Sequence, residues 1–134
     1  YVRTWRYLIV TTTLLLAIVL MVLALSGYTI GVWSEKIAGR LKGWHLAFFW
    51  TGFLFDSAGT TLMGQISMSL SLNLHTITGA LAILLMLIHA IWASIVLLRK
   101  DEVAATQFHK FSLIVWILWL IPFVTGAYLA MQSA

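Results

Sequence analysis

Cysteine is absent from the 134-residue sequence, and proline and charged residues are scarce. Without cysteine the chain has no disulfide, no iron–sulfur cluster and no thiolate metal site. The single proline, Pro122, lies inside an apolar segment, where a helix in a membrane bundle tolerates it as a kink. Charged residues make up only 9% of the sequence, whereas a soluble domain carries about 25% because water must solvate its surface. The composition therefore predicts a protein whose surface faces lipid.

Hydrophobic residues make up 62% of the sequence and gather in four long segments. These segments cover residues 7–32, 44–66, 72–98 and 108–131. Each is longer than the ~20 residues that a helix needs to cross the hydrocarbon of a bilayer. Backbone polar groups in lipid must be satisfied within the segment, so these spans are expected to be helices. We therefore predict an all-α, integral membrane four-helix bundle that forms a single domain over residues 1–134.

A cleaved signal peptide is the alternative for the first segment. Arg3 and Arg6 precede its apolar run, and the small residues of Ala24-Leu25-Ser26 come later in it. The run is much longer than the ~7–15 residues of a signal-peptide core, so a transmembrane helix is favoured.

The basic residues indicate an orientation. Four crossings place both termini on one side of the membrane and the first and third connections on the other. Six basic residues lie in or beside those two connections: Lys36, Arg40, Lys42, Arg99, Lys100 and Lys110. The positive-inside rule therefore predicts exoplasmic termini in a multi-pass protein of a bacterial cytoplasmic membrane. Because these residues are short-loop anchors rather than a patch, the net charge of +4 does not predict a nucleic-acid partner.

Two of the four histidines share one face of the third segment. His75 and His89 are 14 residues apart, which is nearly four helical turns and ~21 Å of rise. Gly79 and Ala82 lie between them on the same seam and would open space for a flat macrocycle, although small residues also serve close helix packing. His89 lies about ten residues in from Arg99 and therefore roughly 15 Å deep. An ionisable ring at that depth predicts a functional site.

The second segment carries a matching seam. His45 and Met63 are 18 residues apart, five full turns, and so share a face. In an antiparallel bundle His45 lies level with His89, and His109 opens the fourth segment at the same level. Because haem iron takes His/His or His/Met axial pairs, we expect one haem b between His89 and either His45 or His109. A second haem on His75 has no evident histidine partner, and Met63 is among the soft ligands at its level.

Other interpretations of the histidines stay open. His45, His75 and His109 lie near segment ends, where histidine commonly forms hydrogen bonds with headgroups or water. A zinc site built from His45, His89, His109 and Asp56 is a further alternative, because zinc accepts imidazole and carboxylate ligands.

Asp56 lies in the middle of the second segment, about eleven residues past His45 and on nearly the same face. A carboxylate at that depth must be paired, hydrated or protonated. It is interpreted either as a proton relay or as a partner that orients a ligand histidine. The structural alternative is a protonated acid that forms hydrogen bonds with Thr60, Ser57 or a backbone carbonyl.

The remaining motifs point to no enzyme class. Five aromatic residues near the segment ends are typical of a membrane interface: Trp5, Tyr28, Trp33, Trp44 and Tyr128. Trp116 and Trp119 lie deeper and are expected to pack within the bundle. No Ser/His/Asp arrangement, HExxH motif or phosphate-binding loop is present, so no hydrolytic or transferase activity is predicted.

Several short runs along the chain are distinctive in combination. They are Tyr28-Thr-Ile-Gly-Val-Trp-Ser-Glu-Lys36, Gly43-Trp-His45, Asp56-Ser-Ala-Gly-Thr-Thr-Leu-Met-Gly64, His75-Thr-Ile-Thr-Gly79, His89-Ala-Ile-Trp92, Phe108-His-Lys-Phe111 and Trp119-Leu-Ile-Pro-Phe-Val-Thr-Gly126. In these runs the chain resembles the HsmA family of small bacterial membrane proteins, over residues 28 to about 131. The resemblance implies haem binding at the membrane and protection from haem or oxidative stress. A looser similarity, to four-helix b-type cytochromes, points the same way, while the ligand assignments rest on spacing alone.

Three functions follow from these observations. The leading one is a haem-binding membrane protein, which either transfers electrons like a b-type cytochrome, with a quinone or another subunit as partner, or sequesters haem away from lipid. The alternative is a haem-free accessory or structural subunit of a larger membrane complex, which the short loops suit. The third is a small transporter with Asp56 as its protonatable residue.

Overall fold

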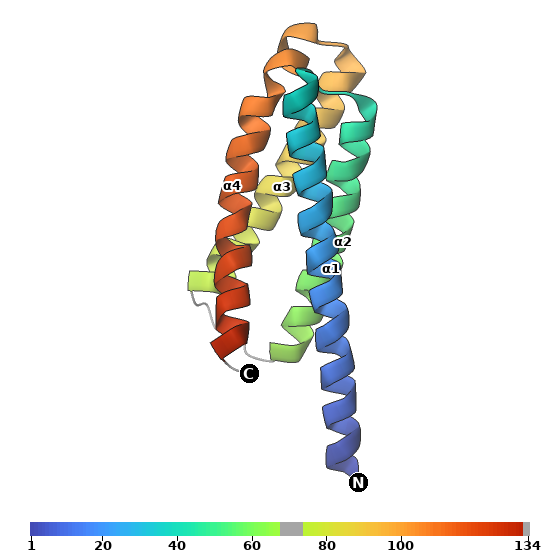
Figure 1. The fold of residues 1–134 in the computed structure, drawn as a ribbon, viewed down its shortest axis with the longest axis vertical. Helices are drawn as coiled ribbons and strands as arrows, with labels where there is room; N and C mark the ends of the chain where they lie inside the picture. Colours follow the sequence, from blue (N-terminus) through green and yellow to red (C-terminus); the bar gives the residue numbers. More distant parts are fainter. Residues whose placement is uncertain (68–73, 133–134) are drawn as a thin grey trace.

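The computed structural model describes residues 1–67 and 74–132, which form four helices (Figure 1). These helices are α1 (Val2–Ala38), α2 (Gly43–Ser67), α3 (Leu74–Arg99) and α4 (Glu102–Gln132). The prediction of an all-helical chain with four helices is confirmed. Residues 72 and 73, with which the third segment was expected to begin, lie outside the described residues.

The helices next to the charged connections are longer than the apolar segments that predicted them. Gly39 ends α1 in the left-handed conformation, with φ of 78°, and its N–H donates to the carbonyls of Glu35 and Lys36. Asp101 caps α4, because its Oδ1 accepts a hydrogen bond of 3.1 Å from Ala104 N–H. The boundaries are thus set by capping residues, which a hydropathy pattern does not register.

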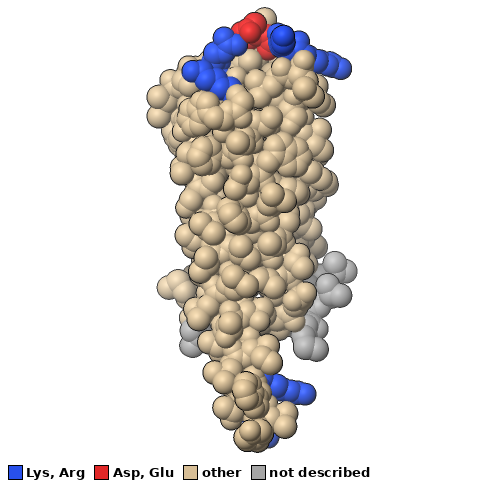
Figure 2. All heavy atoms as spheres, turned by 90° about the vertical axis from the view of Figure 1, so that its right-hand side faces the viewer, with Lys and Arg blue, Asp and Glu red and all other residues tan. Residues whose placement is uncertain are grey.

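The four helices run side by side, and the chain reverses direction at each connection (Figure 1). The start of α1 and the end of α4 lie at the same end of the bundle. The α1–α2 and α3–α4 connections lie at the opposite end, which we call the charged end, because most of the lysine, arginine and acidic side chains gather there (Figure 2). An ion pair between Arg40 and Glu102 ties these two connections together. The side of a membrane that each end faces stays a prediction.

The outer surface of the bundle is apolar. Each helix exposes large aliphatic side chains, and Leu15, Leu54, Leu84 and Ile117 are examples, one from each helix. Among the described residues α1, α3 and α4 are long and apolar enough to cross a membrane. α2 has sufficient length, but it is less apolar because it carries His45, Asp56 and several glycine and threonine residues. Four membrane-spanning helices were expected. By length and composition, three of the described helices could cross a membrane.

α1 and α2 approach each other closely at two glycines. A Cβ atom added to Gly27 would lie 3.3 Å from Gly52 Cα, which is closer than ordinary contact. A Cβ added to Gly52 would lie 2.7 Å from Tyr28 Cδ1. Glycine is needed here because the two backbones, and the Tyr28 ring that lies across α2, occupy the space of a side chain.

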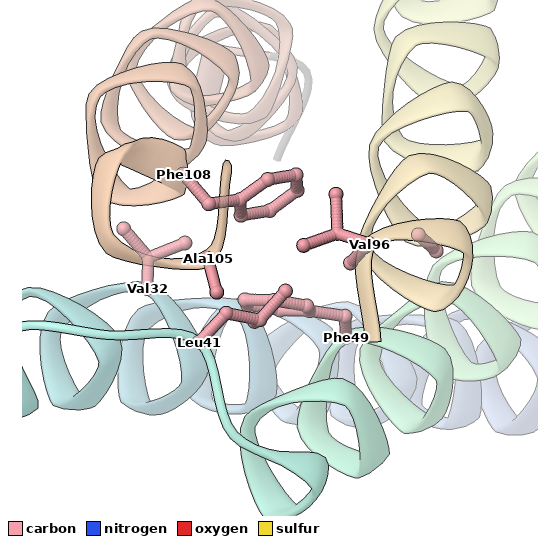
Figure 3. Close-up of a cluster of buried hydrophobic side chains, with 8 residues drawn as sticks. Val32, Leu41, Phe49, Val96, Ala105 and Phe108 are labelled. Carbon is pink, nitrogen blue, oxygen red and sulfur yellow. The ribbon is translucent and has the colours of Figure 1, made fainter. Parts of the chain in front are cut away.

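Two apolar clusters fill the interior. The cluster nearer the charged end comprises Val32, Leu41, Phe49, Ala90, Ala93, Val96, Ala105 and Phe108. Val96 from α3 and Phe108 from α4 point toward Phe49 and Leu41 in its centre (Figure 3). The second cluster comprises Ala24, Tyr28, Ala82, Met86, Val115 and Trp119. Together they bring side chains from all four helices into contact.

The glycine contact predicts opposite effects for two substitutions in α2. Gly52→Ala places a methyl group on the Tyr28 ring and is expected to lower the free energy of unfolding by about 1–3 kcal/mol. Gly64→Ala is the matched control, because a Cβ there meets no atom of the described residues within 4 Å. Removing backbone freedom at Gly64 should raise the free energy of unfolding by about 0.5–1 kcal/mol. Unfolding in detergent, followed by circular dichroism, measures both. Equal effects of the two substitutions would contradict the close approach.

Candidate functional site in the bundle interior

Five polar side chains are almost completely buried in the described part of the chain. Their exposed fractions are 0% for Glu35, His45 and Ser112, 1% for His89 and 2% for Asp56. Burying such groups without hydrogen bonds costs several kcal/mol, so their partners identify where the bundle holds polar chemistry. Most of these hydrogen bonds belong to two groups, one around Ser112 and one around Asp56.

The first group is a chain of three side chains from three helices, Glu35 of α1, Ser112 of α4 and His89 of α3, which we call the polar relay. Ser112 Oγ donates to Glu35 Oε1 at 2.7 Å and lies 2.8 Å from His89 Nε2. A serine hydroxyl has one hydrogen. Because that hydrogen points to Glu35, Ser112 Oγ accepts from His89 Nε2–H, which leaves Nδ1 of the neutral ring unprotonated.

Both ends of the polar relay carry an atom without a partner. Glu35 Oε2 and His89 Nδ1 are buried and make no hydrogen bond in the described residues. Almost all buried polar atoms in proteins have a partner, so two unpaired atoms in one short chain require an explanation. The relay is therefore hydrogen-bonded in its middle, and one atom at each end has no partner among the described residues.

Aromatic rings surround the histidine of the relay. The ring centroids of Phe49, Phe108 and Phe111 lie 4.4, 5.2 and 5.7 Å from that of His89. These three side chains replace water around the imidazole. Hydrogen bonds in such a low-dielectric setting are electrostatically stronger than in water, which strengthens the coupling along the chain.

His45 lies at the start of α2 and is fully buried. Its Nδ1 accepts a hydrogen bond of 2.9 Å from Lys42 N–H, so the neutral ring carries its hydrogen on Nε2. Nε2 is buried without a partner in the described residues. One ring nitrogen of His45 therefore stabilises the start of α2, and the other has no partner among the described residues.

The remaining predicted ligands lie apart from the polar relay. His75 is half-buried, and its Nδ1 lies 3.3 Å from Thr125 Oγ1 on α4. His109 is half-buried, and its Nδ1 lies 3.2 Å from Thr106 O one turn earlier. Over residues 1–67 and 74–132 no three His, Asp or Glu side chains converge as a metal-ion site. The zinc alternative therefore finds no support in the described residues.

The predicted macrocycle space between His75 and His89 is partly filled. Gly79 has room for a Cβ atom, because no atom of the neighbouring described residues lies within 4 Å of the Cβ position. Ala82, in contrast, packs in the second apolar cluster. Met63 on α2 is half-buried. The small residues of this seam thus serve helix packing in its deeper part and leave space only beside Gly79.

The fit of a haem to this interior is partial. His45 Nε2 and His89 Nδ1 are buried nitrogens without partners, which an iron would satisfy. However, His89 uses Nε2 for Ser112, and the Phe49 ring lies directly against its imidazole. As placed, His89 is a member of the relay through Nε2 and has only Nδ1 to offer to an iron. Haem binding and the assignment of His45, His75, His89 and His109 as its ligands stay predictions.

The second polar group surrounds Asp56 and ties three helices together; we call it the Asp56 cluster. Tyr28 Oη and Trp119 Nε1 donate to Asp56 Oδ2 at 3.0 and 2.9 Å. Thr60 Oγ1 donates to Oδ1 at 3.4 Å. The predicted contact with Thr60 is confirmed, and none of these partners is a histidine. These contacts hold the Asp56 side chain against partners from α1, α2 and α4.

The sequence interpretation missed four of these residues. Tyr28 was expected at the membrane interface, but it is buried and donates to Asp56. Trp119 packs within the bundle as expected, and only its hydrogen bond to Asp56 was missed. Glu35 and Ser112 were not singled out. One signal for Glu35 was available, because it follows Tyr28 by seven residues, which is two helical turns and the same face. Ser112 gave no such signal.

The middle of the polar relay predicts a stability effect. Ser112→Ala leaves Glu35 Oε1 and His89 Nε2 without partners and is expected to lower the free energy of unfolding by about 1–3 kcal/mol. Ser26→Ala is the matched control, because Ser26 is exposed and donates only within its own helix, to Val22 O; its effect should stay within about 0.5 kcal/mol. Denaturant titration in detergent compares them. An effect of Ser112→Ala no larger than the control would show that the hydroxyl does not join the two groups.

Comparison with known proteins adds no assignment to this geometry. No protein-family model, curated protein or solved structure matches the chain. The resemblance to the HsmA family therefore stays a prediction, and the two polar groups are interpreted from their own contacts.

Proposed function

We propose that the chain is an integral membrane protein that holds and passes protons through the polar relay inside its helical bundle. One observation supports this most directly: Glu35, Ser112 and His89 form a continuous hydrogen-bonded chain, and an atom at each end has no partner within residues 1–67 and 74–132. Ionisable residues inside membrane bundles are rare and mark ion or proton pathways. The two hydrogen bonds join groups that can each release one proton and accept another.

The setting of the relay supports a membrane location. Exposed aliphatic side chains cover the helices, while the carboxylates and imidazoles of Glu35, Asp56 and His89 are inside. A water-soluble protein distributes these groups the opposite way. The lysine and arginine side chains at the charged end suit the cytoplasmic side of a bilayer.

The hydrogen-bond directions define how a proton moves. A proton that reaches His89 Nδ1 makes the ring an imidazolium, which then releases its Nε2 proton to Ser112 Oγ. Ser112 passes its own hydroxyl proton to Glu35 Oε1. The result is a protonated Glu35, a restored Ser112 and a neutral His89 with its hydrogen on Nδ1. No heavy atom has to move far during transfer, because both distances are already within hydrogen-bond range.

The phenylalanine rings around His89 keep water away from the imidazole, so that the proton passes from side chain to side chain. Phe49, Phe108 and Phe111 occupy the space that water would need beside the imidazole. A proton on His89 therefore meets one polar neighbour within hydrogen-bond distance, Ser112. Reorientation of the His89 ring, which is needed for a second transfer, is limited by the same rings.

Proton flux into liposomes tests the proposal. The purified protein is reconstituted with a pH-sensitive dye inside, and a potassium diffusion potential drives protons inward. The wild type should acidify the lumen faster than protein-free liposomes. Ser112→Ala and Glu35→Gln should lower this flux at least about tenfold, which corresponds to about 1.4 kcal/mol of added barrier. Ser112→Thr retains a hydroxyl and should retain most of the flux.

The control is Ser26→Ala, which removes a hydroxyl outside the relay and should leave the flux unchanged. Equal flux in the wild type, Ser112→Ala and protein-free liposomes would rule out proton transfer by the relay. Circular dichroism of each reconstituted variant checks that it is folded, so that a loss of flux is not a loss of structure.

Haem binding is the second candidate, because His45 Nε2 is buried and unpartnered. A bound haem b would supply a one-electron redox centre. His45 as its ligand would have to give up the bond from Lys42 N–H, so that Nε2 could offer a lone pair. Absorption spectra of the protein purified in mild detergent, oxidised and dithionite-reduced, test this. A Soret band lost in His45→Ala would support it, and a preparation that stays colourless after addition of haemin would exclude it.

A further inference from the structure

A cavity opens at the charged end of the bundle, where the α3–α4 connection meets Arg40 of the α1–α2 connection. Its volume is about 210 Å³. Because one water molecule takes up about 30 Å³ of the liquid, the cavity has room for about seven waters. It is therefore large enough for a small polar group and not only for a single ion.

The charged side chains that line the cavity balance each other. Arg40 and Lys100 are basic, and Asp101 and Glu102 are acidic, so the lining has no net formal charge. The acidic side chains lie among the basic ones at this end (Figure 2). Arg40 pairs with Glu102, and Asp101 Oδ1 caps α4. Within residues 1–67 and 74–132 the Lys100 ammonium makes no ion pair, and Asp101 Oδ2 takes no part in the cap. The lining thus offers a charge of each sign to a ligand.

Lys100 occupies a backbone position that usually belongs to glycine. Its φ is 53°, its N–H donates to Leu97 O at 3.2 Å, and Asp101 N–H donates to Val96 O at 3.3 Å. These two bonds end α3 with a left-handed residue. Gly39 ends α1 in the same conformation, with φ of 78°. A side chain in this conformation is unfavourable, so glycine would serve the backbone better. The lysine at this point therefore indicates a use for its ammonium.

The surroundings of the cavity suit the headgroup of a phospholipid. Val96, Leu97 and Ala105 supply the apolar part of the lining. Leu98 and Val103, on either side of the connection, are 82% and 70% exposed. A phospholipid likewise joins a charged headgroup to an apolar body. In the membrane location proposed above, the lysine and arginine side chains of this end lie among headgroups.

We propose that the cavity binds the headgroup of phosphatidylethanolamine. The lipid phosphate accepts hydrogen bonds from Lys100 and Arg40, and the lipid ammonium donates to Asp101 and Glu102. The acyl chains lie against the exposed aliphatic side chains of α3 and α4. This site uses the membrane location proposed above but no residue of the polar relay, so that lipid binding and proton transfer can each fail without the other.

The charges of the lining favour this headgroup over two common alternatives. A zwitterion matches a lining that has no net charge. Phosphatidylglycerol would add a negative charge and leave the carboxylates of Asp101 and Glu102 without a cationic partner from the lipid. Phosphatidylcholine carries a quaternary ammonium, which has no N–H to donate to these carboxylates.

Native mass spectrometry of the purified protein tests the proposal, because it separates lipid-bound from lipid-free forms of a 15.0 kDa chain. The protein in mild detergent is titrated with each of the three phospholipids. Phosphatidylethanolamine should bind at one site at least about tenfold more tightly than the other two, which corresponds to about 1.4 kcal/mol. Glycerophosphoethanolamine has the headgroup without acyl chains and should bind more weakly. Equal affinity for this soluble compound would overturn a lipid as the occupant.

Two variants test the lining. Lys100→Gly should lower the affinity for phosphatidylethanolamine about tenfold. Its melting temperature, followed by circular dichroism, should not fall, because glycine suits the left-handed backbone. Asp101→Asn retains an oxygen that can cap α4 but removes the charge, and should abolish the preference over phosphatidylglycerol.

Lys110→Ala is the matched control, because it removes a positive charge of α4 that does not line the cavity. Its affinity for phosphatidylethanolamine should equal that of the wild type. An equal loss of affinity in Lys100→Gly and Lys110→Ala would show general attraction of lipid to a basic surface and overturn the proposal. Equal binding of all three phospholipids by the wild type would overturn it as well.

Discussion

The close approach of α1 and α2 at Gly27 and Gly52 sets the position of most of the polar interior. Because no side chain separates the two backbones there, the Tyr28 ring crosses α2 and its hydroxyl reaches Asp56. Trp119 of α4 then meets the same carboxylate oxygen. Two turns beyond Tyr28, on the same face of α1, Glu35 is directed into the bundle and reaches Ser112. One contact between small residues thus places both buried acids of the structure against partners on α4.

The two polar groups differ in the way they are completed. Asp56 accepts three hydrogen bonds, and its position is over-determined by three helices. The polar relay is paired only in its middle, and its terminal atoms are open. A fully satisfied polar group rigidifies a bundle, whereas unpaired buried atoms are costly and call for an explanation. This difference is the reason for interpreting Asp56 as a tether between helices and for proposing proton exchange by Glu35, Ser112 and His89.

The helices were predictable from sequence because long apolar segments leave the backbone no other solution. Their charged ends were not, since Gly39 and Asp101 extend the helices by capping rather than by hydropathy. The depth of His89 and Asp56 correctly marked them as buried polar residues, and Thr60 as a partner of Asp56. Partners on other helices could not be predicted, because helical spacing fixes the face of a residue but not which neighbouring helix that face meets. Ser112 and Trp119 became recognisable only through contacts of that kind.

The length of α1 has a consequence for the surroundings of the bundle. Its 37 residues correspond to ~55 Å of helix, and the side chains of its first turns are all exposed. Arg6 and Lys36 are 30 residues, or ~45 Å, apart along it, which matches the ~40–45 Å of a bilayer with its headgroups. In a bilayer of that thickness both basic side chains reach headgroups with α1 upright. A thinner bilayer would force α1 to tilt, and because α1 is packed on α2 at glycine contacts, the whole bundle would tilt with it.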